Sequence, residues 1–198
     1  MSEIEHDNCP GFCPGRRDAL RAGAGGIAVG VFGLPESAGA QGVDSLDYPR
    51  KHVAKLSQLE DGIPVAFTYP LEQQPNFIVK LGVPAQGGVG PGSDIVAFSS
   101  LCTHMGGNLR GRYRHDLKAV GPCPFHFSTF DLTKSGIPVH ASATQLLPQV
   151  VLAAVDDDIF AVGMHGLIYG FRHNLKDGTL AAGAVLRPST GKLTTMRG

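Results

Sequence analysis

Short apolar segments alternate with stretches rich in glycine and proline along most of this chain. These segments are rich in β-branched and aromatic residues and are bounded by turn-forming residues, a pattern that is typical of β-strands. No repeat and no long amphipathic helix interrupts the pattern. The sequence therefore predicts an all-β fold, an antiparallel sandwich or barrel, with a loop-rich insert at about residues 100–145. The expected strands are Ile63–Tyr69, Phe77–Leu81, Ile95–Ser99, Val150–Val155 and Ile159–Val162, and the pattern also allows a last strand near Leu167–Phe171.

Residues 1–40 have a different pattern from the rest of the chain. The pair Arg16 and Arg17 precedes a weakly apolar run, AGAGGIAVGVFGL, at residues 22–34. This run is shorter than the ~20 residues that a transmembrane helix needs, so we expect no stable membrane anchor. It suits the apolar part of a signal peptide, and Ala38-Gly39-Ala40 has the form of a cleavage site. The segment resembles a twin-arginine export signal, which implies a periplasmic protein that begins near Gln41.

Composition and charge narrow the class of protein further. The 198 residues carry 17 basic and 17 acidic side chains, and 27 glycines and 14 prolines favour turns over long helices. A net charge of zero gives no reason to expect nucleic-acid binding. Residues 41–198 would form one domain, and of the 4 cysteines only Cys102 and Cys123 lie within it.

Two short motifs in the insert carry the candidate chemistry. CTHMGG, at residues 102–107, contains Cys102 and His104, and CPFHFS, at residues 123–128, contains Cys123 and His126. A disulfide between the cysteines would leave the histidines without a role. A zinc site would accept two thiolates and two imidazoles, but a zinc finger usually takes its cysteines from one loop and its histidines from another. One cysteine and one histidine from each loop instead suit a pair of irons, one bound by both thiolates and one by both imidazoles.

The two motifs resemble the Rieske [2Fe–2S] signature, C-T-H-x-G-C followed by C-P-x-H-x-S. The resemblance implies one [2Fe–2S] cluster per chain, ligated by Cys102, His104, Cys123 and His126. It also implies that the hydroxyl of Ser128 bonds a bridging sulfide. Many Rieske proteins join the two loops by a second cysteine pair, and the matching positions here are Gly106 and Phe125. The disulfide cannot form in this chain, and we expect these two residues to face each other across the cluster.

Longer segments resemble the small subunit of arsenite oxidase, notably HVAKLSQLEDGIPVAFTYP (52–70) and AVGMHGLIYG (161–170). This resemblance implies a periplasmic electron-transfer subunit that is not catalytic alone. Its partners would be a large subunit that contains molybdopterin and a cytochrome c or similar carrier. The small subunit of iodate reductase is a close alternative, and a cytochrome bc-type Rieske subunit is a more distant one. A zinc-stabilised periplasmic binding module is the alternative from another class.

Overall fold

The computed structural model describes residues 48–176 and 178–186, so the predicted export signal lies outside the described residues. In this part of the chain every named strand pair is antiparallel, and the helices are two single 3-10 turns, η1 (Leu56–Gln58) and η2 (Leu132–Lys134). No helix here is long and apolar enough to cross a membrane. The strands are β1 (Arg50–Lys55), β2 (Val65–Thr68), β3 (Pro75–Lys80), β4 (Ile95–Ser99), β5 (Tyr113–Arg114), β6 (Ala119–Val120), β7 (Thr129–Asp131), β8 (Ile137–His140), β9 (Gln149–Val155), β10 (Asp158–His165) and β11 (Ala184–Val185).

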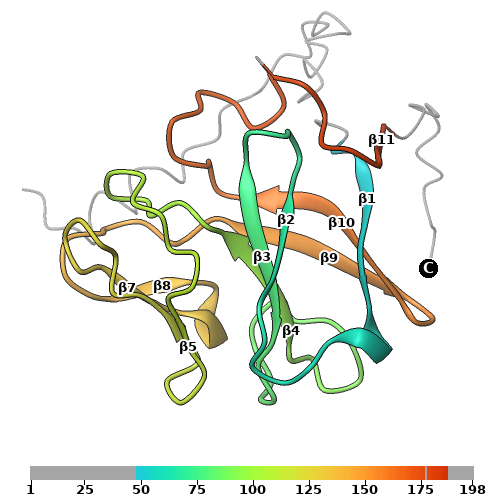
Figure 1. Ribbon diagram of the computed structural model, residues 1–198, viewed down its shortest axis with the longest axis horizontal. Helices are drawn as coiled ribbons and strands as arrows, with labels where there is room; N and C mark the ends of the chain where they lie inside the picture. Colours follow the sequence, from blue (N-terminus) through green and yellow to red (C-terminus); the bar gives the residue numbers. More distant parts are fainter. Residues whose placement is uncertain (1–47, 177, 187–198) are drawn as a thin grey trace, which may run out of the picture. The chain divides into compact units, whose positions relative to one another are not determined.

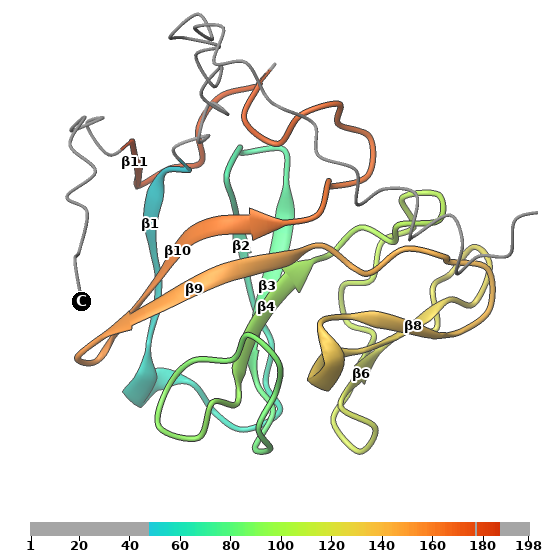
Figure 2. The ribbon, with the colours of Figure 1, turned by 180° about the vertical axis from the view of Figure 1, so that it is seen from behind.

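The strands form two sheets. The larger one has seven strands in the order β11-β1-β10-β9-β4-β3-β2, and the smaller one has four in the order β5-β6-β7-β8. All strands of the smaller sheet come between β4 and β9 in the sequence, and both views of the ribbon place this sheet to one side of the larger one (Figure 1, Figure 2). The predicted antiparallel all-β fold is confirmed.

Alternating side chains of β3 and β4 divide the core into two clusters, because successive residues of a strand point to opposite faces. Ile78 and Ala97 belong to the core of the larger sheet. Phe77 and Phe98 point the other way and share a second core with the smaller sheet. This second core contains both Cys102 and Cys123. The two thiols are therefore fixed by the same apolar packing that joins the sheets.

The five strands expected between Ile63 and Val162 are all present in the larger sheet, but the first begins later than predicted and the possible sixth strand is absent. The strand predicted from Ile63 begins only at Val65, because the N–H of Ile63 donates to the carbonyl of Glu60 in a turn. Residues 167–171 form no strand and belong to a loop after β10. Gly166 and Gly170 bound this loop at φ +85° and +89°, in the left-handed region that an extended strand does not use.

Candidate metal centre

Two loops of the same design hold the four residues of the cysteine–histidine motif. Cys102 lies shortly after β4, and Cys123 lies in the connection between β6 and β7. In the first loop the N–H of Gly106 donates to the carbonyl of Cys102 at 2.8 Å, and the N–H of Cys102 donates to the carbonyl of Gly107 at 2.9 Å.

The second loop repeats this hydrogen-bond scheme. The N–H of Phe127 donates to the carbonyl of Cys123 at 3.0 Å, and the N–H of Cys123 donates to the carbonyl of Ser128 at 2.9 Å. Gly106 and Phe127 thus occupy equivalent positions, and both have a left-handed backbone, with φ +69° and +61°. The two ligand loops therefore contain the same tight turn, and each turn has a cysteine at its first position.

The potential metal donors meet as two pairs. The thiols of Cys102 and Cys123 are buried and free, and they interact with each other. The Nδ1 atoms of His104 and His126 lie 3.1 Å apart, and both rings have access to solvent. Within the described residues, no group of three or more histidine, cysteine and acidic side chains is arranged to hold one metal ion.

Local backbone groups act on the buried thiol of Cys102. Burial raises the pKa of this thiol, because the charged thiolate loses its hydration in the core. The backbone N–H groups of His104 and Met105 act in the opposite direction by donating to the sulfur. These donors suit a thiolate that binds a metal, since they stabilise negative charge on the sulfur.

The donor set fits a binuclear iron–sulfur group. A thiol pair on the inner side and an imidazole pair on the outer side offer each of two irons two protein ligands. Gly107 keeps the space beside the thiols open, because a Cβ added there would lie 2.5 Å from the Sγ of Cys123. The structure therefore brings the four candidate ligands together as one pair of thiols and one pair of imidazoles, and their assignment as cluster ligands stays a prediction.

A third loop, residues 141–148, joins the two ligand loops, and sequence reasoning missed it. The buried hydroxyl of Ser128 accepts a hydrogen bond from the N–H of Ala143 at 3.0 Å. The hydroxyl of Thr103 donates to the carbonyl of Gln145 at 3.0 Å. The oxygen of Ser128 thus has a partner in the protein, while its proton is left to donate elsewhere. No charge or metal-ligand pattern in the sequence marks this loop.

Gly106 and Phe125, which we expect to face each other across the cluster, have other residues as their nearest neighbours. The nearest heavy atoms to a Cβ added at Gly106 all belong to the ring of Tyr169, at 2.5, 2.7 and 3.5 Å. Phe125 lies instead beside Gly107, 3.3 Å from a Cβ added there, and its ring meets the ring of His126 edge to face. Tyr169 comes from the loop after β10, which the sequence pattern had suggested as a strand.

Exposed apolar side chains stand on the two ligand loops and on the two loops that contact the first ligand loop through Thr103 and Gly106. Three of them stand on the ligand loops, and the others come from the third loop and from the loop after β10. They are Met105, Phe125, Phe127, Leu146, Leu167 and Tyr169, and each is at least 41% exposed. We call this set the apolar rim. An apolar patch next to a reactive group is typical of a surface that contacts another protein.

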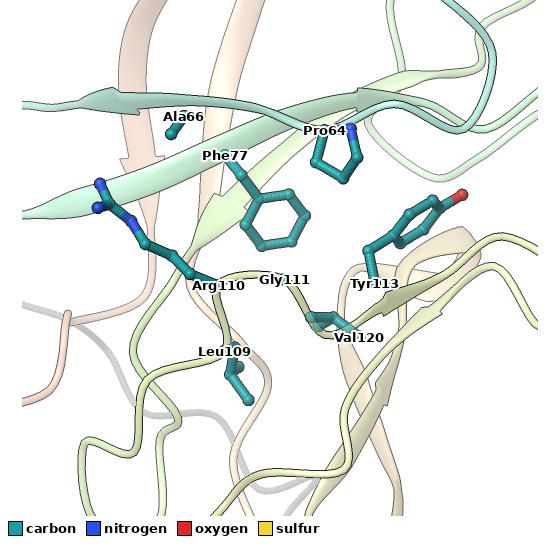
Figure 3. A pocket seen from close by; sticks show the side chains of 8 residues that line it. All are labelled: Pro64, Ala66, Phe77, Leu109, Arg110, Gly111, Tyr113 and Val120. Atoms are coloured by element: carbon teal, nitrogen blue, oxygen red, sulfur yellow. The ribbon is translucent and has the colours of Figure 1, made fainter.

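A separate cavity of about 160 Å³ lies between β2–β3 and the smaller sheet (Figure 3). Its lining is mostly apolar, and Figure 3 shows Pro64, Phe77 and Tyr113 around one space. Burial raises the pKa of Tyr113 to about 12, since the phenolate would lose its hydration here. None of the four predicted ligands lines this cavity, so it is distinct from the metal centre.

Two other described histidines, His115 and His173, make side-chain contacts away from the ligand loops. His115 meets the hydroxyl of Tyr113 at 3.2 Å and the ammonium of Lys118 at 2.9 Å. His173 accepts a hydrogen bond from the N–H of Leu175. Neither of these contacts involves the imidazole pair.

Comparison with known proteins identifies the family. The model of the Rieske [2Fe-2S] domain matches residues 50–159, a range that includes both ligand loops and more than half of the chain. The chain belongs to the Rieske [2Fe–2S] family. The family's cofactor, a [2Fe–2S] cluster, agrees with the paired donors described above. The predicted cofactor is thus confirmed at the level of the family.

Two relatives show which kind of Rieske protein this chain is similar to. Iodate reductase subunit IdrB of Denitromonas iodatirespirans is 48% identical over 163 residues, which cover 82% of this chain and 87% of the relative. The subunit of the same name from Pseudomonas sp. (strain SCT) is 44% identical over 167 residues, with 84% and 87% covered. Among solved structures, the soluble domain of Rieske protein II (soxF) from Sulfolobus acidocaldarius matches with a TM-score of 0.56 at 26% identity. That match covers 67% of this chain and 85% of the other.

Proposed function

We propose that this Rieske protein is the electron-transfer subunit of a periplasmic molybdopterin oxidoreductase, with Cys102, His104, Cys123 and His126 as the cluster ligands. One observation carries the proposal. Two turns with the same hydrogen-bond scheme place the two thiols together in the core and the two imidazoles together at the surface. This arrangement supports one-electron exchange through the imidazole side.

A cluster held by two thiolates and two imidazoles takes up and returns one electron, at potentials in the range of about −150 to +300 mV. The protein groups around it have separate roles. The buried cysteines anchor the site in the core that joins the sheets. The solvent-accessible histidines offer the shortest protein route to a partner, and the apolar rim would exclude water when a partner docks.

The substrate of the complex decides the direction of electron flow. Reduction of iodate to iodide consumes six electrons, so a subunit serving it would pass electrons to the large subunit. Oxidation of arsenite to arsenate releases two electrons, so the same subunit would carry them away. The identity to the two iodate reductase subunits supports the first assignment. The resemblance of segments 52–70 and 161–170 to the arsenite oxidase small subunit supports the second.

The direction can be measured on one purified complex of this chain with its large subunit. The cluster is first reduced with dithionite, excess reductant is removed, and iodate is added under argon. An iodate-reducing complex loses the EPR signal of the reduced cluster. In the reverse experiment, arsenite added to the oxidised complex creates that signal if the complex oxidises arsenite. A complex that responds to neither substrate would contradict both assignments.

The ligand assignment is tested on the isolated chain. Replacing His104→Ser should abolish the rhombic EPR signal of the reduced cluster, whereas the control His115→Ser, in the same subdomain, should leave it intact. An unchanged signal in the first variant would refute the assignment. A colourless wild-type protein that contains zinc and no iron would support the binding-module alternative instead.

The proposed location rests on Arg16, Arg17 and the Ala38-Gly39-Ala40 sequence. Export by the twin-arginine route predicts a periplasmic protein whose N-terminal residue is Gln41 or a close neighbour. N-terminal sequencing of the periplasmic fraction tests this, with the Arg16→Lys/Arg17→Lys variant as the control that should stay inside the cell. A membrane-bound form that retains Met1 would favour an anchored subunit of the cytochrome bc type.

A further inference from the structure

We infer that Tyr169 is a positioning residue for the cluster, because its ring holds the first ligand loop, residues 102–107, against a rigid support. This inference rests on the ligand assignment proposed above. Tyr169 donates no ligand atom and acts only through the backbone of Gly106. Its effect would reach the cluster through Cys102 and His104, which lie in the same tight turn.

The contact itself is close and specific. A Cβ added at Gly106 would come within 2.5 Å of Cδ1 and 2.7 Å of Cε1 of Tyr169. No larger residue fits there unless the ring moves. The N–H of Gly106 closes the turn by its bond to the carbonyl of Cys102. The ring of Tyr169 therefore packs against Gly106, the residue whose N–H closes the ligand turn.

The loop that carries Tyr169 is held firmly from behind. Its neighbour Ile168 is fully buried in the core of the larger sheet. The buried side chain of Asn174 accepts a hydrogen bond from the N–H of Ile168 at 3.1 Å and donates to the carbonyl of Gly166 at 2.8 Å. The same amide donates to the hydroxyl of Tyr48 at 3.2 Å. Tyr169 thus projects from a braced loop toward the ligand turn.

The two ligand loops differ in this support. Gly106 lies under Tyr169, whereas its equivalent in the second loop, Phe127, is 62% exposed. The first loop has one further side-chain tie described above, from Thr103 to Gln145. A cavity of about 180 Å³ lies beside that tie, lined by Thr103 and the loop after β10. On the side that faces the loop after β10, the packing support of the first ligand loop therefore comes mainly from the ring of Tyr169.

A double-mutant cycle tests the contact without reference to the cluster. Gly106→Ala should lower the melting temperature of the wild-type protein through two effects, the left-handed backbone and the collision with the ring. In a Tyr169→Ala background only the backbone effect remains, so the drop caused by Gly106→Ala should be smaller. Equal drops in both backgrounds would overturn the proposed contact, whatever group the site binds.

The positioning role is tested on the iron-loaded chain. We expect Tyr169→Ala to release iron to a chelator roughly twofold to tenfold faster, the range that corresponds to loss of one aromatic contact. We also expect its reduction potential and EPR g-values to shift, while Tyr169→Phe keeps the wild-type values of all three quantities. The control Leu167→Ala removes an exposed apolar side chain from the same loop and should change none of them.

Two results would refute the positioning role. One is a Tyr169→Ala protein with wild-type iron release, potential and g-values. The other is a Leu167→Ala protein that changes as much as Tyr169→Ala, since the whole loop would then matter and not the ring. A wild-type chain that shows no Rieske EPR signal would refute the ligand assignment instead, and the double-mutant cycle would still report on the contact.

Discussion

Phe127 has a backbone conformation that is unfavourable for a residue with a Cβ. Replacing it by glycine or by alanine separates the effect of this backbone conformation from the effect of losing the ring. Its backbone has φ +61°, and its ring is 62% exposed beside His126. The equivalent residue of the other ligand loop is Gly106. We predict that Phe127→Gly is more stable than Phe127→Ala, the reverse of the usual order of the two residues. Both variants lose the ring, so the difference between them measures the backbone alone.

The size of the difference follows from two opposing terms. A left-handed conformation costs a residue with a Cβ about 1–2 kcal/mol, and glycine escapes this cost. Glycine loses about 0.5–1 kcal/mol relative to alanine because its unfolded chain is more flexible. The net expectation is that the free energy of unfolding of Phe127→Gly exceeds that of Phe127→Ala by about 0.75 kcal/mol, the midpoint of a range of about 0–1.5 kcal/mol. At Gly106, where φ is +69°, Gly106→Ala should be destabilising by the same reasoning.

Urea unfolding of the iron-loaded variants, followed by circular dichroism and by loss of visible absorbance, measures the difference. Both Phe127 variants should also transfer electrons to the partner complex more slowly than wild type, because both lack the ring of the apolar rim. A Phe127→Ala protein as stable as Phe127→Gly would refute the backbone argument. Wild-type transfer rates in both variants would remove Phe127 from the docking surface without affecting the stability argument.

Three further predictions concern other parts of the protein. Ser128→Ala should lower the free energy of unfolding by about 1–3 kcal/mol, because the buried N–H of Ala143 loses its acceptor, and urea titration against Ser128→Thr as the control measures the loss. Asn174→Ala should lower the free energy of unfolding by a similar amount, about 1–3 kcal/mol, since the N–H of Ile168 is left unpaired. Proteolysis of this variant that is slower than that of wild type would contradict this expectation. The neutral form of Tyr113 is favoured in the folded state, where its pKa is about 12 against about 10 when unfolded. Its stabilising contribution should therefore be fully present below pH ~10 and lost as the pH rises toward 12, so the unfolding midpoint of wild type relative to Tyr113→Phe should fall over that range. A constant difference between the two proteins would contradict the raised pKa.

Local signals in the sequence were sufficient to predict the strands and motifs whose structure depends on residues that are close in the sequence. The core strands β3, β4, β9 and β10 have high β propensity and clear turn residues at their ends, so their positions were predicted within a few residues. The candidate metal donors could be named from the sequence because the spacing of their cysteines and histidines is restrictive, and their role as ligands stays a prediction. The structure adds what spacing cannot give, namely that the two thiols form one pair and the two imidazoles form another.

Contacts between segments that are distant in the sequence could not be predicted in this way. Nothing in the sequence around Tyr169 indicates that its ring covers Gly106, 63 positions earlier. The possible strand at residues 167–171 was wrong because the side chain of Asn174 takes the N–H of Ile168 that a strand would have paired. β1 gives only a weak strand signal in the sequence because several of its side chains are polar.

The strand order also determines when each part of the protein can form during folding. In the smaller sheet every pair joins strands that are consecutive in the chain, β5 with β6, β6 with β7 and β7 with β8, so this sheet has low contact order. β1, in contrast, lies between β10 and β11, the last two strands of the described residues. Pairings of large sequence separation form slowly because their loops close at a high entropic cost. We therefore expect the smaller sheet and its second ligand loop to form early, and the larger sheet to close only after β10 and β11 have left the ribosome.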